Sequence, residues 1–454
     1  MIFFSKSTRI KAFLKKATID EKTLRYLIGL VAAFLMRCGR MSASQGGQSV
    51  RAEARHRANV TRFLAKCRWS RSWTDCYWMA TLLLEEERRT PGHWVFILDQ
   101  THCSQQGKKT ENTFSSGNRK RRPFKGRRYG KTVHHPKTIH AFVMGLLITP
   151  SGLRLPVSKS YYTKNYCEQK GITYRTQSEL GAELIRELHV PSHASVTVLG
   201  DTAYEAKAIR LACAKRNYTW IVPLNPERVL AGAKPRPKVR TLLSEMPAER
   251  FVPIRLDPNQ GDFVDQRRLS RCRIGPKVKS RTFYVHSETR AIHSIGMAQL
   301  VFSCKEQPSN DKPIPLSKIL VTNNVKLKPS EVVELYSLRW QIELFFKELK
   351  STLGIHQYRF RQYEKVANWV QIALVAFLFL EWTRGKKLRQ RAHSDKKKDW
   401  WRNQRTHGLC RAVRQTAEGK ELAELARLAN TKTGIKKLKK LLKSALPLEY
   451  RATA

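Results

Sequence analysis

Two aspartates stand where short apolar segments of the sequence end. Asp99 follows residues 94–98 and Asp201 follows residues 195–199, and both runs are typical of buried strands. In an α/β sheet, ligands commonly bind at the edge formed by the carboxyl ends of the strands. We therefore expect Asp99 and Asp201 to share a site at one edge of a sheet. The alternative is that each is an ordinary solvated strand end.

A third carboxylate, Glu343, belongs to a segment with helical periodicity, residues 335–350. At about 100° per residue, its apolar side chains form one stripe, and a row of polar side chains runs along the border of that stripe. A polar row beside a buried face is half-buried, unlike an ordinary solvated face. The row consists of Tyr336, Arg339, Glu343 and Lys350. The alternative is a solvated helix with an i,i+4 salt bridge between Arg339 and Glu343.

Asp99, Asp201 and Glu343 together are suited to bind a pair of Mg²⁺ ions, which take oxygen ligands and keep positions open for water and phosphate. Such a pair activates a water or a 3′-hydroxyl and stabilises the leaving oxygen of an in-line displacement. Mn²⁺ accepts the same oxygen ligands and is expected to substitute. The sequence therefore predicts a two-metal site that acts on a phosphodiester.

Other catalytic arrangements find little support. No Ser-His-Asp order, phosphate-binding loop or Cys/His metal spacing competes with the acidic trio. His102 and Cys103 follow Asp99 closely but are expected to be packing or loop residues, and the pair His134-His135 is expected to be solvated or near phosphate.

The elements that must position these residues divide the chain into five regions. Residues 1–90 are predicted to be helical, either as a DNA-binding domain or as a helical cap on the next domain. Strands and helices alternate from residue 91, and short strands among Pro, Gly and charged residues indicate an all-β insertion. The predicted regions are 1–90, 91–224 (first part of an α/β core), 225–318 (the β insertion), 319–384 (second part of the core, with Glu343) and 385–454 (a basic region).

The charge balance points to a polyanionic partner. Lysine and arginine number 86 against 36 acidic residues, which gives a formal charge of +50, and 41% of the chain is hydrophobic, as in a folded protein. Such a chain repels itself unless a polyanion is bound, and nucleic acid is the first candidate. Basic residues gather in the loop 107–137 and in 386–443. The expected backbone contacts in the loop are Arg119, Lys120, Arg121, Arg122, Lys125, Arg127 and Arg128.

A membrane location is not expected. The longest apolar runs, Leu24–Met36 and Ile372–Leu380, are shorter than the roughly 20 residues that a spanning helix needs, and the amino-terminal residues lack the order of a signal peptide. Nine cysteines without a CxxC pair suggest reduced thiols. The protein is therefore expected in a bacterial-type cytoplasm, associated with DNA.

The spacing of the polar row resembles a known signature. Tyr336-x2-Arg339-x3-Glu343-x6-Lys350 is similar to the YREK signature of insertion-sequence-four-type DDE transposases. Phe96-Ile-Leu-Asp99 and Val198-Leu-Gly-Asp201-x2-Tyr204 resemble the first and second acidic motifs of that family, in the same order. The likeness covers roughly residues 90–382.

This resemblance implies a ribonuclease-H-like core, an α/β fold with a mixed sheet flanked by helices, interrupted by a β-strand insertion between Asp201 and Glu343. It implies binding to the terminal inverted repeats of a transposon, Mg²⁺-dependent cleavage at its ends, and transfer of the 3′-hydroxyl ends into target DNA by a homodimer. Asp99, Asp201 and Glu343 would then hold metal, while Tyr336, Arg339 and Lys350 hold the DNA end.

One departure from the family concerns tryptophan. Well-studied relatives stack a flipped base on a tryptophan of the β insertion, but residues 225–318 contain none. Trp220 and Trp340 lie near the predicted catalytic segments and are expected in the core. Two other readings stay open: a non-catalytic DNA-binding protein with a decayed core, and a two-metal nuclease without strand transfer.

Overall fold

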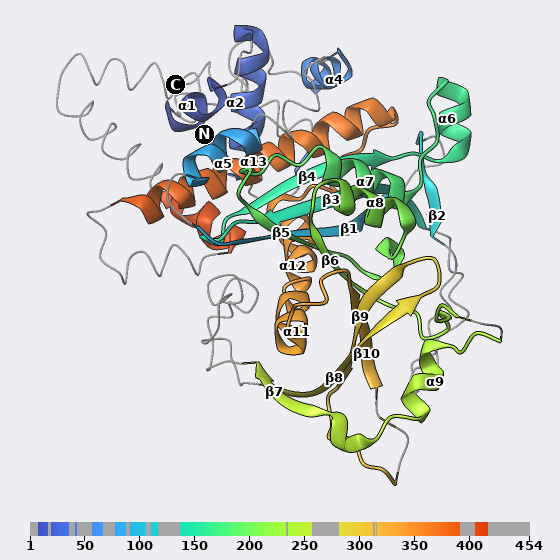
Figure 1. Ribbon diagram of the computed structural model, residues 1–454. Helices are drawn as coiled ribbons and strands as arrows, with labels where there is room; N and C mark the ends of the chain where they lie inside the picture. The colour runs from blue at the N-terminus through green and yellow to red at the C-terminus, as the bar shows by residue number, and fades with distance from the viewer. Residues whose placement is uncertain are drawn as a thin grey trace, which may run out of the picture.

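The computed structural model describes a mixed α/β protein. The described residues are 8–16, 20–35, 41–42, 57–66, 78–87, 91–105, 110–116, 137–232, 235–256, 281–311, 314, 316–390 and 405–415. A single ten-stranded sheet runs through them, with helices packed on it (Figure 1). The α/β class expected from the sequence is confirmed, and the mixed sheet is consistent with a ribonuclease-H-like core.

The strands of the sheet are mixed in direction. They are β1 (His93–Gln105), β2 (Phe114–Ser116), β3 (Lys137–Ile148), β4 (Arg154–Tyr161), β5 (Ser195–Leu199), β6 (Thr219–Pro223), β7 (Val252–Leu256), β8 (Arg281–Ile292), β9 (Gly296–Cys304) and β10 (Leu316–Thr322). Their order is β2-β3-β1-β5-β6-β10-β9-β8-β7, and β4 also pairs with β3. The pairs β1–β5 and β5–β6 are parallel, whereas β3 runs antiparallel to β1 and β10 runs antiparallel to β6.

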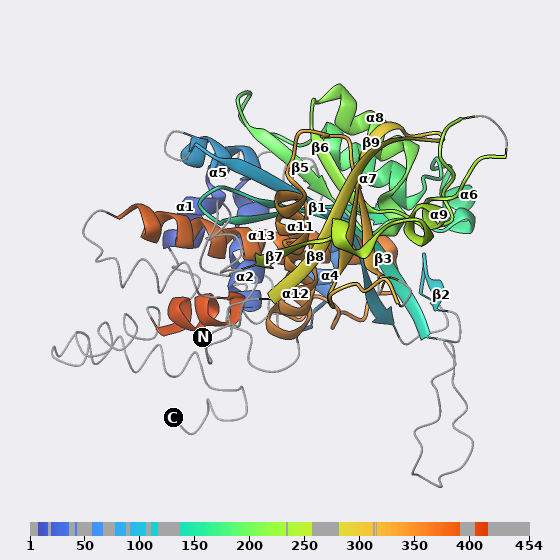
Figure 2. The same ribbon diagram turned by 60° about the horizontal axis from the view of Figure 1, so that its bottom comes forward.

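Helices and short helical turns surround this sheet. They are α1 (Thr8–Leu14), α2 (Glu21–Leu35), α4 (Arg57–Lys66), α5 (Trp78–Glu87), α6 (Lys164–Lys170), α7 (Gln177–Arg186), α8 (Lys207–Lys215), α9 (Val239–Ser244), α11 (Pro329–Ser337), α12 (Trp340–Glu348) and α13 (Tyr363–Arg389), with the short turns η3 (Thr202–Tyr204), η4 (Ala248–Arg250) and η5 (Leu349–Leu353). Figures 1 and 2 both show α11 and α12 lying against the middle of the sheet.

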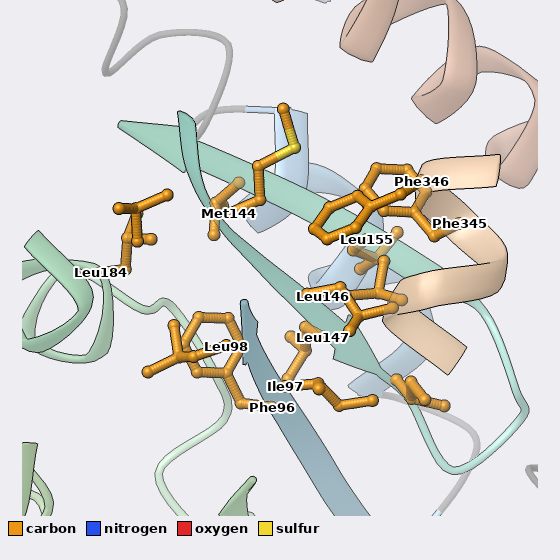
Figure 3. Packing of buried hydrophobic residues seen from close by; sticks show 14 of the residues in the cluster. Phe96, Ile97, Leu98, Met144, Leu146, Leu147, Leu155, Leu184, Phe345 and Phe346 are labelled. Atoms are coloured by element: carbon orange, nitrogen blue, oxygen red, sulfur yellow. The ribbon is translucent and has the colours of Figure 1, made fainter. Parts of the chain in front are cut away.

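The core forms on both faces of β1. Because side chains alternate along a strand, Ile97 and Asp99 share one face and Phe96 and Leu98 share the other. Helix α12 contacts β1, while α7 contacts β3 and β4. In Figure 3, Phe345 and Phe346 of α12 stand on one side of these strands and Leu184 of α7 stands on the other. The sheet is therefore buried between helices, which holds β1 in a fixed position.

The segment 225–318 extends the main sheet. Its strands β7, β8 and β9 form a meander, and β9 pairs with β10, which in turn pairs with β6. The segment also contains the six-residue helix α9 and the turn η4, so it is not purely β. Residues 257–280 of the predicted β insertion lie outside the described residues. Whether this segment is an insertion into the core stays a prediction.

The amino-terminal helices pack on α13. Phe13 contacts Phe379 with ring centroids 5.6 Å apart, and Phe34 contacts Trp369 at 4.9 Å. The Asn368 side chain donates a hydrogen bond to the Leu64 carbonyl at 2.7 Å. Figure 1 shows α1, α2, α4 and α5 gathered around α13. The described helices of residues 1–90 thus pack on α13, and both sequence-based hypotheses for this region, a DNA-binding domain and a helical cap, stay predictions.

Helix α13 is the helix of the described chain whose length and composition would allow it to cross a membrane. Its apolar window is entirely buried inside the protein. It also carries Glu381 and Arg384, which are buried and paired with each other. These are the properties of a core helix.

Candidate active site

Asp99 lies within β1, seven residues into a thirteen-residue strand. The sequence predicted that the strand ends there, but β1 continues to Gln105 because β3 pairs with it along that length. The parallel partner β5 stops earlier, and its last pair with β1 is Ile97 with Leu199. Asp99 therefore lies just beyond the end of β5, where the edge of β1 is no longer covered by a neighbouring strand.

Asp201 follows the end of β5, at the same edge of the sheet as Asp99. Its carboxylate caps the turn η3 by accepting a hydrogen bond from the Ala203 amide at 2.9 Å. The turn is held by Tyr204, whose ring is buried. A Cβ atom at Gly200 would come within 2.7 Å of the Tyr204 Cβ, so only glycine fits this close approach. The packing of Tyr204 thus determines where Asp201 stands.

The third motif spans two helices. The predicted single helix over 335–350 is interrupted by a turn at Leu338 and Arg339, which separates α11 from α12. The predicted apolar stripe is nonetheless buried throughout, at Leu335, Leu338, Ile342, Phe345 and Leu349. Helix α12 is followed by η5, a π-helical turn that ends at Gly354 with φ of 70°, a left-handed conformation that suits glycine.

Arg339 joins two of the three acids. Its guanidinium donates to Glu343 and, from Nη1, to Asp99 Oδ2 at 3.4 Å. The salt bridge considered from the sequence, Arg339 with Glu343, is therefore present. It does not lie on a solvated face, because the Arg339 side chain is only 16% exposed. One arginine thus connects the first and third motifs, which are far apart in the sequence.

The acids also interact through their charges. The pKa of Asp99 is raised to about 6, mainly by burial and also by the charges of Asp201 and Glu343, while the Gln100 amide and Arg339 oppose the rise. Burial also raises the pKa of Tyr336 to about 12, with smaller contributions from Arg339, Asp201 and Asp99. Asp99, Asp201, Glu343, Tyr336 and Arg339 therefore form one electrostatic unit.

Lys350 approaches the site from the side of β1. It lies in η5 and is half-buried. Burial and, after it, the charge of Lys350 lower the pKa of His102, and burial raises the pKa of the Cys103 thiol to about 11. Cys103 is fully buried in β1 and packs there, as expected, whereas the loop considered for these two residues is a strand.

The carboxylate oxygens of Asp99, Asp201 and Glu343 are the kind of ligand that a divalent cation binds. The charges of Asp201 and Glu343 act on Asp99 and contribute to its raised pKa, and a cation would relieve this repulsion. In the present arrangement the Arg339 guanidinium is the cation that Asp99 and Glu343 share. Among the described residues, no group of three or more His, Cys, Asp or Glu side chains is arranged to hold a metal ion.

Two side chains near the site, those of Trp340 and Lys318, lie where the sequence does not predict them. Trp340 was expected in the core but is 54% exposed, because it begins α12 directly after the turn that carries Arg339; Trp220 is buried, as expected. Lys318 of β10 carries no signal in the sequence, because an isolated lysine in a short apolar strand belongs to no motif. The residues Arg119, Lys120, Arg121, Arg122, Lys125, Arg127 and Arg128 lie outside the described part of the chain.

Comparison with known families connects these motifs. The family described as DDE superfamily endonuclease matches residues 12–245, just over half of the chain, and includes Asp99 and Asp201. The family described as Transposase DDE domain matches residues 174–379, which include Asp201 and Glu343. No curated protein matches the sequence. All three acids therefore fall within regions similar to enzymes that cleave nucleic acids.

Proposed function

Because the chain belongs to the DDE superfamily of endonucleases, we propose that it is a DNA transposase of the insertion-sequence-four type. It binds the terminal inverted repeats of its element, cleaves at the ends, and transfers the 3′-hydroxyl ends into target DNA. Its partners are double-stranded DNA and, in the DNA complex, a second copy of the chain. The protein works in the cytoplasm, bound to DNA.

One observation carries this proposal: Arg339 pairs with both Asp99 and Glu343. Asp99 and Glu343 come from the first and third motifs of the YREK-type pattern, and the charge of Asp201 from the second motif also acts on Asp99. A decayed core would have no reason to keep three acids in mutual repulsion, which costs stability.

The roles of the side chains follow from their chemistry. Asp99, Asp201 and Glu343 would hold two Mg²⁺ ions, or Mn²⁺ in their place, which supply activation of the attacking hydroxyl and stabilisation of the leaving oxygen. Arg339 offers a fork of donors to a phosphate and Lys350 a point charge. Tyr336 stays protonated at neutral pH, since its pKa is raised, and its hydroxyl therefore remains a hydrogen-bond donor.

The test uses duplex DNA copied from the two flanks of the coding region. Asp99→Asn, Asp201→Asn and Glu343→Gln should each reduce Mg²⁺-dependent cleavage roughly a thousandfold or more, because such groups act as a unit. Each variant should still bind the duplex. Asp311→Asn, at an exposed position, is the control and should cleave like the unchanged protein.

Two results would favour the other functions. DNA binding without cleavage by the unchanged protein, in Mg²⁺ or Mn²⁺, would indicate a non-catalytic DNA-binding protein. Cleavage without joined products on a substrate that carries both flanks would indicate a two-metal nuclease. Joined products that require both ends, formed by a dimeric complex, are the result expected of a transposase.

A further inference from the structure

The sheet topology brings two lysines to the edge where the acids lie. Strands β5 and β6 are parallel, so their carboxyl ends share the edge that holds Asp201. Because β10 runs antiparallel to β6, the first residues of β10, with Lys318 among them, lie at that same edge. Strand β9 is antiparallel to β10 and ends there as well, at Cys304, so Lys305 follows directly.

Lys318 is held against the catalytic helices. Its ammonium lies 4.8 Å from the centroid of the Tyr336 ring. Tyr336 is buried, and its helix α11 packs on β10. Lys318 shares a face of β10 with Leu320 and Thr322, and α11 covers that face. A cation over an aromatic face is attracted by the ring, so the long lysine side chain is oriented.

The charges around Lys318 belong to the site already described. Burial lowers the pKa of Lys318, Arg339 and Lys305 lower it further, and Glu343 and Asp201 raise it. The ammonium is therefore within electrostatic reach of two of the acids, while its side chain remains open to solvent. No ion pair between Lys318 and either acid is formed in the described structure. The ammonium thus keeps donors for a ligand that arrives from solution.

Lys318 and Lys350 belong to different parts of the site. The charge of Lys350 acts on His102 and Cys103 of β1, whereas Lys318 lies on β10, and β5 and β6 stand between these two strands in the sheet order. We propose that Lys318 binds a DNA backbone phosphate next to the acidic site, on the side away from Lys350. The duplex would then cross the strand ends from β1 towards β10. This inference rests on the proposed function.

The experiment measures how the affinity for duplex DNA depends on KCl concentration, without divalent metal. The probe is an end-labelled duplex copied from one flank of the coding region. Each lost phosphate contact reduces the slope of log affinity against log salt by about 0.9. Lys318→Gln should show this loss and Lys318→Arg should restore the slope. Lys215→Gln, at the exposed carboxyl end of α8, removes the same charge at the opposite edge of the sheet and should leave the slope unchanged.

A role of Lys318 in packing alone predicts other results. In that case Lys318→Met, which keeps an unbranched chain over the Tyr336 ring, would bind DNA with the slope of the unchanged protein, and this result would overturn the proposal. A thermal unfolding midpoint close to that of the unchanged protein shows that each variant is folded. If Lys318→Gln proves unstable, Lys318→Met alone decides the question, with the loss of about 0.9 in slope as the supporting result.

The experiments can reject the Lys318 contact without rejecting the transposase function, and the reverse. Binding is measured without metal, so the slope reports on Lys318 even if the protein never cleaves DNA. The Asp99→Asn variant, which should not cleave, should show the same loss of slope when Lys318→Gln is added. Cleavage by the unchanged protein together with an unaltered slope in Lys318→Gln would reject the lysine contact and leave the transposase proposal standing.

Discussion

At the scale of single residues, burial sets the protonation behaviour of the groups around β1. Asp99 has a raised pKa because it is largely buried beside two other acids, and Arg339 moderates the rise. Trp340, by contrast, presents its indole to solvent next to Arg339. An exposed aromatic ring beside an arginine that is proposed to bind phosphate is suited to stack on a base, since stacking tolerates any sequence.

His93 at the start of β1 makes stability depend on pH. Burial lowers its pKa to about 4, and its Nε2 lies 2.7 Å from Thr197 Oγ1. Between the unfolded pKa of about 6.5 and the folded value, the unfolded chain binds more protons. The contribution of His93 to the free energy of unfolding is therefore complete above about pH 6.5 and is lost as the pH falls towards 4. This loss amounts to at most about 3 kcal/mol.

The measurement is the thermal unfolding midpoint between pH 7.5 and pH 4.5. The unchanged protein should lose more stability over this range than His93→Gln, which cannot titrate. His189, which lies on an exposed surface, provides the control: His189→Gln should follow the unchanged protein. Equal pH dependence in His93→Gln and the unchanged protein would contradict the prediction.

At the scale of elements, a buried ion network fastens α12, the helix that carries Glu343, to the core. Arg154 at the start of β4 donates to Glu348 of α12 at 2.9 Å and to Glu381 of α13 at 3.4 Å. Arg384 pairs with Glu381, and Thr406 donates to Glu348 at 2.7 Å. Glu348 follows Glu343 on the same helix by just over one turn, so this network fixes the position of the third acid.

Breaking the network should be costly. Glu381→Gln leaves Arg384 buried without its ion-pair partner and leaves Arg154 with Glu348 alone; breaking a buried pair in this way destabilises a protein by about 3–5 kcal/mol. Chemical denaturation should show this loss in the free energy of unfolding. Glu187→Gln, which breaks an exposed pair with Lys159, should cost less than about 1 kcal/mol. Similar losses in the two variants would argue against the buried network.

At the scale of the whole molecule, the net charge is the main source of attraction to DNA. A net charge of +50 makes long-range attraction to DNA strong and dependent on salt. The described site uses few of these charges, so most of the attraction comes from elsewhere in the chain. The segment Arg119–Arg128 is the expected region, although it lies outside the described residues.

Neutral substitutions in this segment should weaken binding to all DNA sequences by similar factors. Arg121→Gln with Arg122→Gln should lower the salt slope by about 1.8 if both residues bind phosphates. Affinities for a flank duplex and for an unrelated duplex should fall together, because phosphate contacts carry no sequence information. Loss of the preference for the flank duplex alone would instead assign base recognition to this segment.

The sequence by itself determined the acidic motifs of this protein and much of its local structure. The spacing from Tyr336 to Lys350 predicted a half-buried polar row, and short apolar runs predicted the strands that precede Asp99 and Asp201. These are short-range properties, since the period of an apolar pattern depends only on neighbouring residues. The families that match the chain agree with the acidic motifs found in this way.

Only the tertiary structure decided how the motifs meet. The extension of β1 past Asp99 depends on pairing with β3, and the place of Lys318 at the acidic edge depends on the antiparallel entry of β10. The exposure of Trp340 depends on a turn inside a continuous helical pattern. Strand pairing and helix docking join residues far apart in the chain, and no local pattern records which partners will meet.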